Sequence, residues 1–410
     1  MAEIISEDDF RQEAVAFLDA NSSLAVAEKT SWGQGGDKVS LFPEKSAEQE
    51  QSEVSEAKAW RSLVFEAGFA WISGPPAYGG RGLPRSYERT YQSVEAAYAT
   101  PPVNCFGIGL GMVAPTILAH ATETAKDAYL RRLWKGELIA CQLFSEPGAG
   151  SDLAGLATKA ERDGDEWVVT GQKVWTSGAQ YSDIGEVICR TDPDLPKHKG
   201  LTGFIVDMHA PGVEVRPLRQ MTGGASFNEV FFNEVRVPDD HRLGDVNQGW
   251  TVALTTLMNE RASIGGGGGG IGGATSTSRL IEMLRWLGKD TDPHLRQQVA
   301  DIYINSKVAG YTNLRAMAKI KAGELPGPEM SIAKLSLTNN MTRISNFLSL
   351  ALGARLVADT GEWGTFSWSD YVLGTPGMRV AGGTDEVMKN IVGERVLGLQ
   401  KEPPPAESRR

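Results

Sequence analysis

A change of residue pattern divides this chain of 410 residues into three parts and restricts its fold more than any other feature. Between Cys141 and about Gly244, short runs of β-branched and aromatic residues alternate with Gly, Pro and Asp, which is typical of strands joined by turns. The flanking segments instead show apolar residues at helical spacing. Several strands with no helix between them predict an antiparallel barrel or sandwich, so we expect an α+β protein.

The expected domain boundaries follow from this pattern. Residues 1–140 should form an all-helical N-terminal domain, residues 141–248 the β domain and residues 249–400 a C-terminal four-helix bundle. A chain of 410 residues exceeds the usual size of one hydrophobic core, which favours more than one domain. Residues 401–410 are proline-rich and charged, and we expect them to be disordered.

The same patterns predict individual elements. Helices are expected in the N-terminal domain at about residues 5–30, 46–67, 85–98 and 109–136, with a turn-rich segment at 75–83. Strands are expected at residues 166–169, 174–175, 185–190, 203–207, 213–217 and 228–237. Helices are expected after the β domain at about residues 250–287, 292–322, 328–359 and 385–397, with a Trp-rich connector at 361–377.

Charge and composition exclude several classes of protein. The net charge of −10 argues against a nucleic-acid surface. The sequence contains no run of about 18 apolar residues, and its acidic start lacks the features of a signal peptide. The three cysteines lie far apart without the spacing of a metal site, which favours a reducing compartment. We therefore expect a cytoplasmic protein with no membrane partner.

Two short motifs at the start of the β domain carry the strongest functional signal. In the first, SEPGAGSD at residues 145–152, glycine backbone N–H groups and the hydroxyls of Ser145 and Ser151 can bind an anion or a carbonyl. In the second, GQKVWTSG at residues 171–178, an aromatic side chain followed by hydroxyls can stack on a ring system and hydrogen-bond its edge. Gly-Ala-Gly alone would indicate a tight turn, but the two motifs together indicate a site for a flat, polar cofactor.

Together these motifs closely resemble those of the acyl-CoA dehydrogenase family, and the resemblance runs from about residue 60 to residue 400. It implies an FAD enzyme in which a base removes the proton next to a thioester while a hydride leaves the next carbon. It also implies roles for the motif residues: Phe144 and Ser145 line the flavin ring, Trp175 flanks it, Ser177 bonds near its reactive nitrogen, and Ser151 meets the acyl-CoA. Family members usually have Thr in place of Ser145 and Ser177.

The resemblance places the catalytic base at an unusual position. Most family members carry Glu-Gly-Thr in the last loop, whereas this chain has Gly382 where that glutamate would stand. A subset takes its base from the helix that opens the C-terminal domain, as a Glu directly before an Arg, and Glu260-Arg261 supplies that pair here. The alternative is an ordinary surface pair on a helix. We expect Glu260 to be the base, with Arg261 and Gly382 on the substrate side.

Other family contacts are incomplete. The helix start at Thr384 and Glu386 would meet the adenosine half of FAD, or these residues would only stabilise the helix. The family's Arg-x-x-Phe-Gly signature, which reaches FAD across a subunit interface, is matched only by Arg285-Trp286-Leu287-Gly288, one residue short. Only Leu352-Gly353-Ala354 stands in place of a glycine-rich pair. Besides a working dehydrogenase, two alternatives therefore remain: a non-catalytic or half-competent subunit of a heteromer, and an acyl-CoA oxidase.

Six consecutive glycines, Gly265–Gly270, follow the proposed base. Each costs about 1 kcal/mol relative to alanine inside a helix, so one interpretation is a helix break. In the other, a continuing helix places Gly267 and Gly268 on the same face as Glu260 and widens the acyl pocket, which predicts a bulky acyl group. The expected partners are an acyl-CoA from lipid or fatty acid degradation, an electron-transfer flavoprotein or similar acceptor, and further subunits of a homotetramer or heterotetramer.

Overall fold

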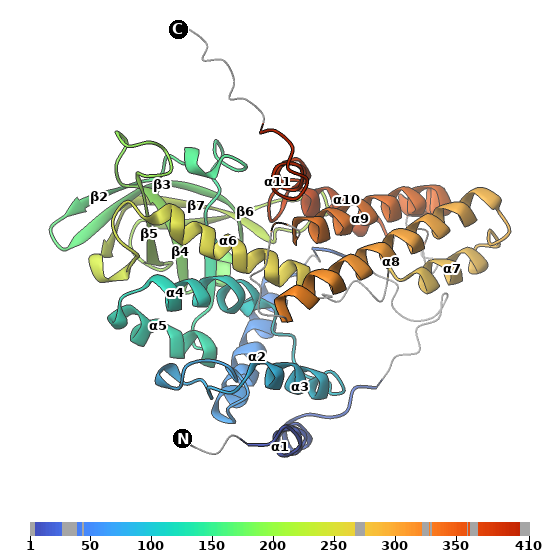
Figure 1. Cartoon of the computed structure of the whole chain (residues 1–410), viewed down its shortest axis with the longest axis horizontal. Helices are drawn as coiled ribbons and strands as arrows, with labels where there is room; N and C mark the ends of the chain where they lie inside the picture. Colours follow the sequence, from blue (N-terminus) through green and yellow to red (C-terminus); the bar gives the residue numbers. More distant parts are fainter. Residues whose placement is uncertain are drawn as a thin grey trace, which may run out of the picture. The chain divides into compact units, whose positions relative to one another are not determined.

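The computed structural model describes residues 5–26, 39–42, 45–266, 275–321, 328, 330–358, 360 and 368–401 (Figure 1). The chain divides into two compact units, which are considered separately. The first unit comprises the described residues of Met1–Glu28 and Glu44–Glu260, and the second comprises those of Lys29–Pro43 and Arg261–Arg410. None of the described helices is both long and apolar enough to cross a membrane. The tail at residues 402–410 lies outside the described residues.

The first unit begins with the expected helices. They are α1 (Glu7–Asn21), α2 (Ala47–Glu66), α3 (Arg85–Glu95), α4 (Ala114–His120) and α5 (Glu123–Lys135). Ser46 and Gln49 form a reciprocal capping box that sets the start of α2 where the pattern predicts it. The single helix expected at 109–136 is wrong, because Ala121 is extended and the Thr122 side chain caps a new helix. The first helix also ends earlier than expected, at Asn21.

The middle of the chain forms one sheet of eight strands. They are β1 (Ala140–Leu143), β2 (Lys159–Asp163), β3 (Glu166–Ser177), β4 (Ile184–Arg190), β5 (Leu201–Asp207), β6 (Val213–Leu218), β7 (Phe227–Pro238) and β8 (Arg242–Leu243). The order is β6-β7-β3-β2-β4-β5-β8, with β1 paired to β4. The pairing is antiparallel except that β1 and β2 run parallel to β4. The runs expected at 166–169 and 174–175 are one bulged strand.

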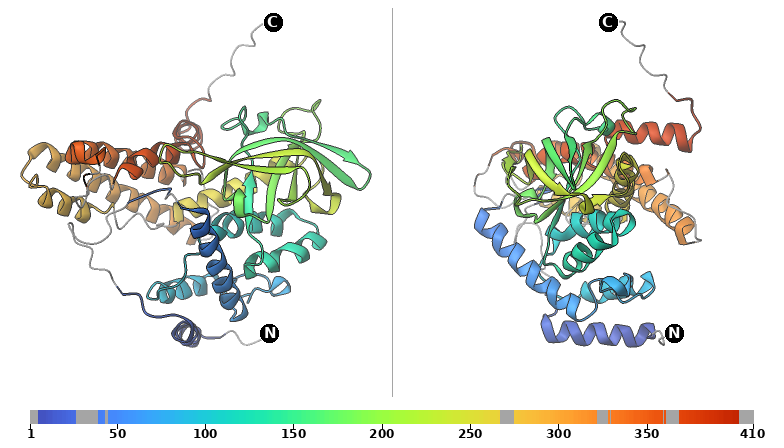
Figure 2. Two further views of the ribbon diagram at one scale, coloured as in Figure 1. Left: turned by 180° about the vertical axis from the view of Figure 1, so that it is seen from behind. Right: turned by 90° about the vertical axis from the view of Figure 1, so that its left-hand side faces the viewer.

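The helices and the sheet of the first unit share a core. Ile117 of α4 and Leu130 of α5 pack in one cluster with Ile188 of β4 and Ile205 of β5. Both views in Figure 2 accordingly show α4 and α5 against the sheet. Val252, from the first part of α6 (Gly249–Gly266), joins the same cluster. The start of α6 is thereby fixed to the sheet.

The second unit is helical, so the expected order of a helical, a sheet and a helical part is confirmed. Its further helices are α7 (Thr277–Trp286), α8 (Pro293–Lys321), α9 (Met330–Leu352), α10 (Ser369–Val380) and α11 (Asp385–Ile391). The single helix expected at 250–287 is wrong, because α6 ends at Gly266 and the Ser276 side chain caps α7. Residues 369–377 of the expected connector belong to α10, which Trp368 and Tyr371 anchor in the core despite Pro376.

Candidate active site

The two sequence motifs are joined by a buried ion pair. The loop 145–152 follows β1, and the second motif forms the end of β3. Lys173 is fully buried, and its Nζ lies 2.9 Å from Oε1 of Glu146 and 3.0 Å from the carbonyl oxygen of Phe144. The backbone N–H of Val174 donates to the carbonyl of Ser145 at 2.8 Å. Two segments almost thirty residues apart are therefore held as one structure.

Glu146 also holds the chain that leaves the first motif. Its carboxylate accepts the backbone N–H groups of Ala157 at 2.6 Å and Thr158 at 2.9 Å. Burial alone raises the pKa of Glu146, but the Lys173 charge and these hydrogen bonds outweigh it and hold that pKa below its ordinary value. Burial lowers the pKa of Lys173, against the opposing charge of Glu146. Sequence reasoning quoted both residues within the motifs but assigned them no role.

A bulge in β3 turns Trp175 out of the sheet. The pairing of β3 with β7 shifts register between Lys173 and Thr176, and Trp175 has a left-handed φ of 62°. Its indole is 62% exposed and contacts only the edge of Phe227 among the aromatic rings described, at 6.2 Å between centroids. A bulky residue rarely adopts this backbone conformation, and such strain clusters at functional sites. The bulge therefore exposes a large flat side chain.

Ser145 and Ser177 flank this bulge, because the carbonyl of Ser145 accepts the N–H of Val174 and Ser177 is two residues after Trp175. Ser145 and Ser177 are partly exposed, and Ser151 is exposed. Phe144 is buried in the core shared with α4, so only its backbone is available to a cofactor. Beside Ser151, the carboxylate of Asp152 pairs with Lys197 of the loop between β4 and β5 at 2.8 Å.

Glu260 lies on α6 and is partly buried. Two threonines fix the preceding turn of this helix: Thr255 bonds to Nε2 of His120 at 2.8 Å, and Thr256 bonds to Oε1 of Glu186 at 2.6 Å. Arg261 continues the helical backbone, but its side chain lies outside the described residues, as do Gly267 and Gly268. The helix continues through Gly265 and Gly266, so the first two glycines of the run do not break it.

The remaining predicted residues belong to the second unit. Gly382 and Gly383 have left-handed φ values of 66° and 94°, a conformation that a glutamate would adopt only with strain. The Thr384 hydroxyl caps α11 by accepting from the N–H of Val387 at 3.2 Å, so it stabilises the start of this helix. Glu386 is exposed. Arg285 is exposed in the last turn of α7.

Asp385, the first residue of α11, is a buried hub of hydrogen bonds. Its carboxylate accepts from Lys334 at 3.0 Å, from Thr338 at 2.8 Å and from Arg379 at 2.8 Å. Burial alone raises the pKa of Asp385, but these donors outweigh it and hold that pKa below its ordinary value. The hub ties α9, α10 and α11 together just after the Gly382 loop.

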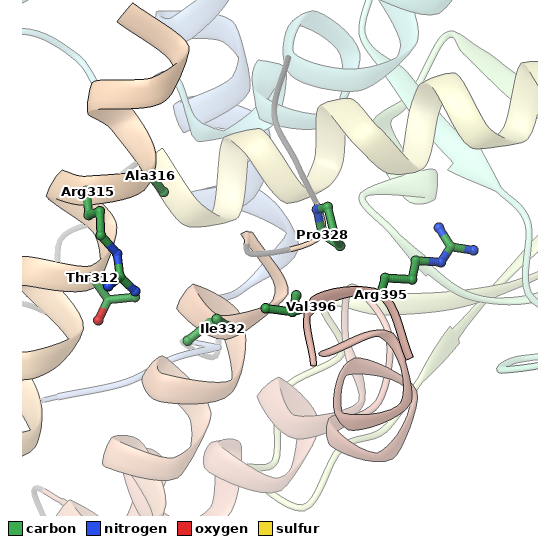
Figure 3. Close-up of a pocket in the computed structure, with 7 residues that line it drawn as sticks. All are labelled: Thr312, Arg315, Ala316, Pro328, Ile332, Arg395 and Val396. Atoms are coloured by element: carbon green, nitrogen blue, oxygen red, sulfur yellow. The ribbon is translucent and has the colours of Figure 1, made fainter. Parts of the chain in front are cut away.

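The second unit also contains a cavity of about 530 Å³ (Figure 3). Its lining combines apolar side chains with two arginines: Thr312, Arg315, Ala316, Pro328, Ile332, Arg395 and Val396. They come from α8, from α9 and the chain two residues before it, and from the turn after α11. None of the predicted site residues is among these seven, so the cavity gives no support to the predicted site.

Known proteins resemble the chain along most of its length. "Acyl-CoA dehydrogenase IpdE1" of Mycobacterium tuberculosis is 35% identical over 362 residues, which cover 86% of this chain and 91% of that protein. "Acyl-CoA dehydrogenase FadE34" of the same organism is 37% identical over 332 residues, which cover 80% of this chain but only 44% of that protein. This chain therefore spans less than half of FadE34.

Solved structures resemble the fold. The "Tcur3481-Tcur3483 steroid ACAD" has a TM-score of 0.73 and 26% identity, covering 98% of this chain and 99% of that chain. The ChsE4-ChsE5 complex from Mycobacterium tuberculosis has a TM-score of 0.69 and 25% identity, covering 98% of this chain and 100% of that chain. Residues 38–137, 141–235 and 247–397 match the descriptions "Acyl-CoA dehydrogenase, N-terminal domain", "middle domain" and "C-terminal domain" in turn. The chain belongs to the acyl-CoA dehydrogenase family.

Proposed function

We propose that this chain is an FAD-dependent acyl-CoA dehydrogenase whose base is Glu260. The observation that carries the proposal is the single surface formed by the two joined motifs, with Trp175 turned outward on the bulge. The test is the visible spectrum of the purified chain. We expect bound flavin that is bleached by an acyl-CoA under anaerobic conditions, whereas a colourless protein would support the half-competent subunit.

Members of this family bind FAD, and the residues of the first unit fit a flavin ring. The outward indole of Trp175 supplies a flat apolar face, and the partly exposed hydroxyls of Ser145 and Ser177 can hydrogen-bond the ring edge. The buried pair beneath them keeps these groups in place without ligand. When bound, FAD accepts the hydride that leaves the substrate. We assign Arg285, Thr384 and Glu386 to the distal half of FAD.

We assign removal of the substrate proton next to the thioester to Glu260, because Gly382, at the family's usual position for the base, offers no carboxylate. At Gly382 the backbone is left-handed, so this loop suits glycine rather than glutamate. Glu260 is partly buried on a helix whose preceding turn is anchored to the sheet, and a base must be held in fixed geometry to remove a carbon-bound proton. Arg261 follows it, and we assign Arg261, Ser151 and Gly382 to the substrate side.

We further propose a bulky acyl group. A structural relative is titled a steroid ACAD, and the glycines after Ile264 remove side chains from the segment that follows the base. Anaerobic flavin reduction should therefore be faster with a steroid carboxylate CoA thioester than with isovaleryl-CoA or octanoyl-CoA. Each 1.4 kcal/mol by which contacts to the larger acyl group stabilise the transition state should raise the rate about tenfold. Preference for octanoyl-CoA would contradict the bulky-substrate proposal while leaving the dehydrogenase proposal intact.

We also propose an oligomer, because two structural relatives carry titles that name two different chains. The shortened signature at Arg285 is consistent with a homotetramer in shifted register or with a sister chain that supplies an arginine. The native mass of the flavin-containing protein distinguishes them, and a flavin-saturated monomer would contradict both. An electron-transfer flavoprotein is the proposed acceptor. Rapid reoxidation of the reduced protein by oxygen would instead favour the oxidase.

Trp175 provides a test of the flavin site that is separate from catalysis. Glycine adopts a left-handed φ without strain. Trp175→Gly should therefore leave the free energy of unfolding of the flavin-free protein unchanged or raise it by about 1 kcal/mol. The same change removes the stacking face and should weaken FAD binding at least tenfold, measured by fluorescence titration. Exposed Tyr303 on α8 is the control, because it lies outside both motifs and the Arg285 signature, and Tyr303→Ala should not weaken FAD binding. Unchanged FAD affinity in Trp175→Gly would contradict the assignment.

A further inference from the structure

Glu186 is a fully buried carboxylic acid in the middle of β4. It is two residues from Ile184 and from Ile188, so it points to the same side of the sheet as these two, toward α4 and α6. Thr256 of α6 lies 2.6 Å from its Oε1, and Thr116 of α4 lies 2.8 Å from the Thr256 hydroxyl. Its Oε2 has no hydrogen-bond partner among the described residues. Three polar side chains are therefore enclosed at the junction of one strand and two helices.

Among the described residues of the cluster, no cation balances this carboxyl group. The neighbouring strands place Gln142 of β1 and Ile205 of β5 beside it, and the helices contribute the two threonine hydroxyls. The titratable groups on these helices are His120, which bonds to Thr255 and whose pKa burial lowers, Glu260 one turn after Thr256, and Arg261, whose side chain lies outside the described residues. Burial raises the pKa of Glu186 to about 8, with Thr256 opposing the shift. Glu186 is therefore predominantly neutral at pH 7.

The cluster gives Glu186 too few hydrogen bonds for a buried carboxylate. Thr256 donates to Oε1 of Glu186 at 2.6 Å, with the Val252 carbonyl 3.3 Å from the same hydroxyl, and Thr116 donates to the Met112 carbonyl at 2.9 Å. Ionisation adds no donor from the described residues. The buried charge then has one donor and no cation, which is costly in an apolar core.

The cluster lies between the two parts of the proposed active site. Thr256 and Glu260 are four residues apart on α6 and so share one face of the helix. On the other side, Gln142 pairs with Glu186 across the sheet, and β1 leads directly into Phe144 and Ser145 of the first motif. A shift of α6 along β4 at this point would move the base relative to the flavin motif.

We propose that Glu186 is a positioning residue that acts through Thr256 to fix α6, and hence Glu260, on the sheet. The inference rests on the proposed function, because it concerns the geometry of that base. Ionisation of Glu186 would strengthen its hydrogen bond to Thr256 but leave a buried charge without a cation, so water must enter between β4 and α6 to solvate it, and α6 should loosen there. Flavin reduction should then fall by roughly 10-fold to 100-fold as the pH rises through about 8, as expected for a displaced catalytic group.

The experiment compares the FAD-loaded wild type with Glu186→Gln, Thr256→Val and Thr256→Ser. Infrared titration should show a carboxylic-acid carbonyl band in the wild type that is lost with a midpoint near pH 8 and is absent in Glu186→Gln. Hydrogen exchange in α6, corrected for its intrinsic pH dependence, should increase over the same range only in the wild type. Flavin reduction by the fastest acyl-CoA should show an alkaline loss that Glu186→Gln lacks. Thr256→Ser should preserve the reduction rate that Thr256→Val loses.

Thr90→Val is the matched control, because Thr90 is also buried in the first unit but bonds to Glu7 and Ser86, away from α6. It should lower thermal stability without changing the pH profile. The inference is overturned if the infrared band is missing at pH 7, if α6 exchange is insensitive to Glu186→Gln, or if both proteins share one alkaline loss. The proposed function fails separately, if no acyl-CoA reduces the flavin or if Glu260→Gln reduces it normally, because the infrared and exchange results do not require turnover.

Discussion

Glu260→Gln is expected to retain FAD and to slow flavin reduction by acyl-CoA by a factor on the order of 10² or more. Glutamine has nearly the same size as glutamate but cannot accept a proton from carbon. Glu260 is only partly buried, so the substitution should leave the packing of α6 unchanged. Stopped-flow absorbance under anaerobic conditions measures the loss, and the flavin content of the purified variant measures whether the fold is retained.

Two further variants sharpen this test. Glu161→Gln changes an exposed carboxylate on β2 and should reduce flavin at the wild-type rate. Introducing Gly382→Glu into Glu260→Gln restores a carboxylate at the family's usual position, but the left-handed φ there costs about 1–3 kcal/mol. We expect this double variant to remain slow. A near wild-type rate for Glu260→Gln alone would show that another group takes the proton.

Features that depend on nearby residues could be predicted from the sequence. The capping box at Ser46 is a local hydrogen-bond pattern, and the structure confirms it. The strands with β-branched and apolar residues, such as β4 and β5, were also expected near their observed positions. The sequence predicts a ligand surface around Trp175, because an aromatic followed by hydroxyls is unusual at a strand end, and that function stays a prediction. Its assignment to FAD came from the family resemblance.

Features that depend on tertiary contacts could not be predicted. The charged strand β2 reads as a loop, yet its backbone pairs with β3 along its whole length. Helix α10 contains Gly374, Pro376 and Gly377 but is held because Trp368 at its start and its own Tyr371 are buried in a core shared with α7, α8 and α9. The pairs Glu146–Lys173 and Glu186–Thr256 join residues 27 and 70 positions apart. Their spacing follows no local period, so no sequence pattern indicates them.

Lys173→Met is expected to destabilise the protein by about 3–5 kcal/mol, because it leaves the buried Glu146 carboxylate without its cation. For a unit of this size that loss corresponds to a fall in melting temperature of about 2–4 °C per kcal/mol. FAD binding should weaken as well, since Lys173 also bonds to the carbonyl of Phe144. Lys159→Met is the matched control, because it breaks an exposed pair with Glu161 that is worth about 0–1 kcal/mol.

The double variant Lys173→Met/Glu146→Gln distinguishes the effect of the unpaired Glu146 charge on stability from the effect of losing the packing of the lysine side chain. Without the unpaired charge, it should be more stable than Lys173→Met alone, because a neutral amide can still accept the N–H of Thr158. In the wild type, the lowered pKa of Glu146 makes the pair stabilising above the unfolded value of about 4.3, and this stability is lost as the pH falls through the folded pKa. Acid unfolding of the double variant should lack that contribution. If both variants lost equal stability at pH 7, the stabilisation would come from packing of the lysine chain rather than from pairing of the charges.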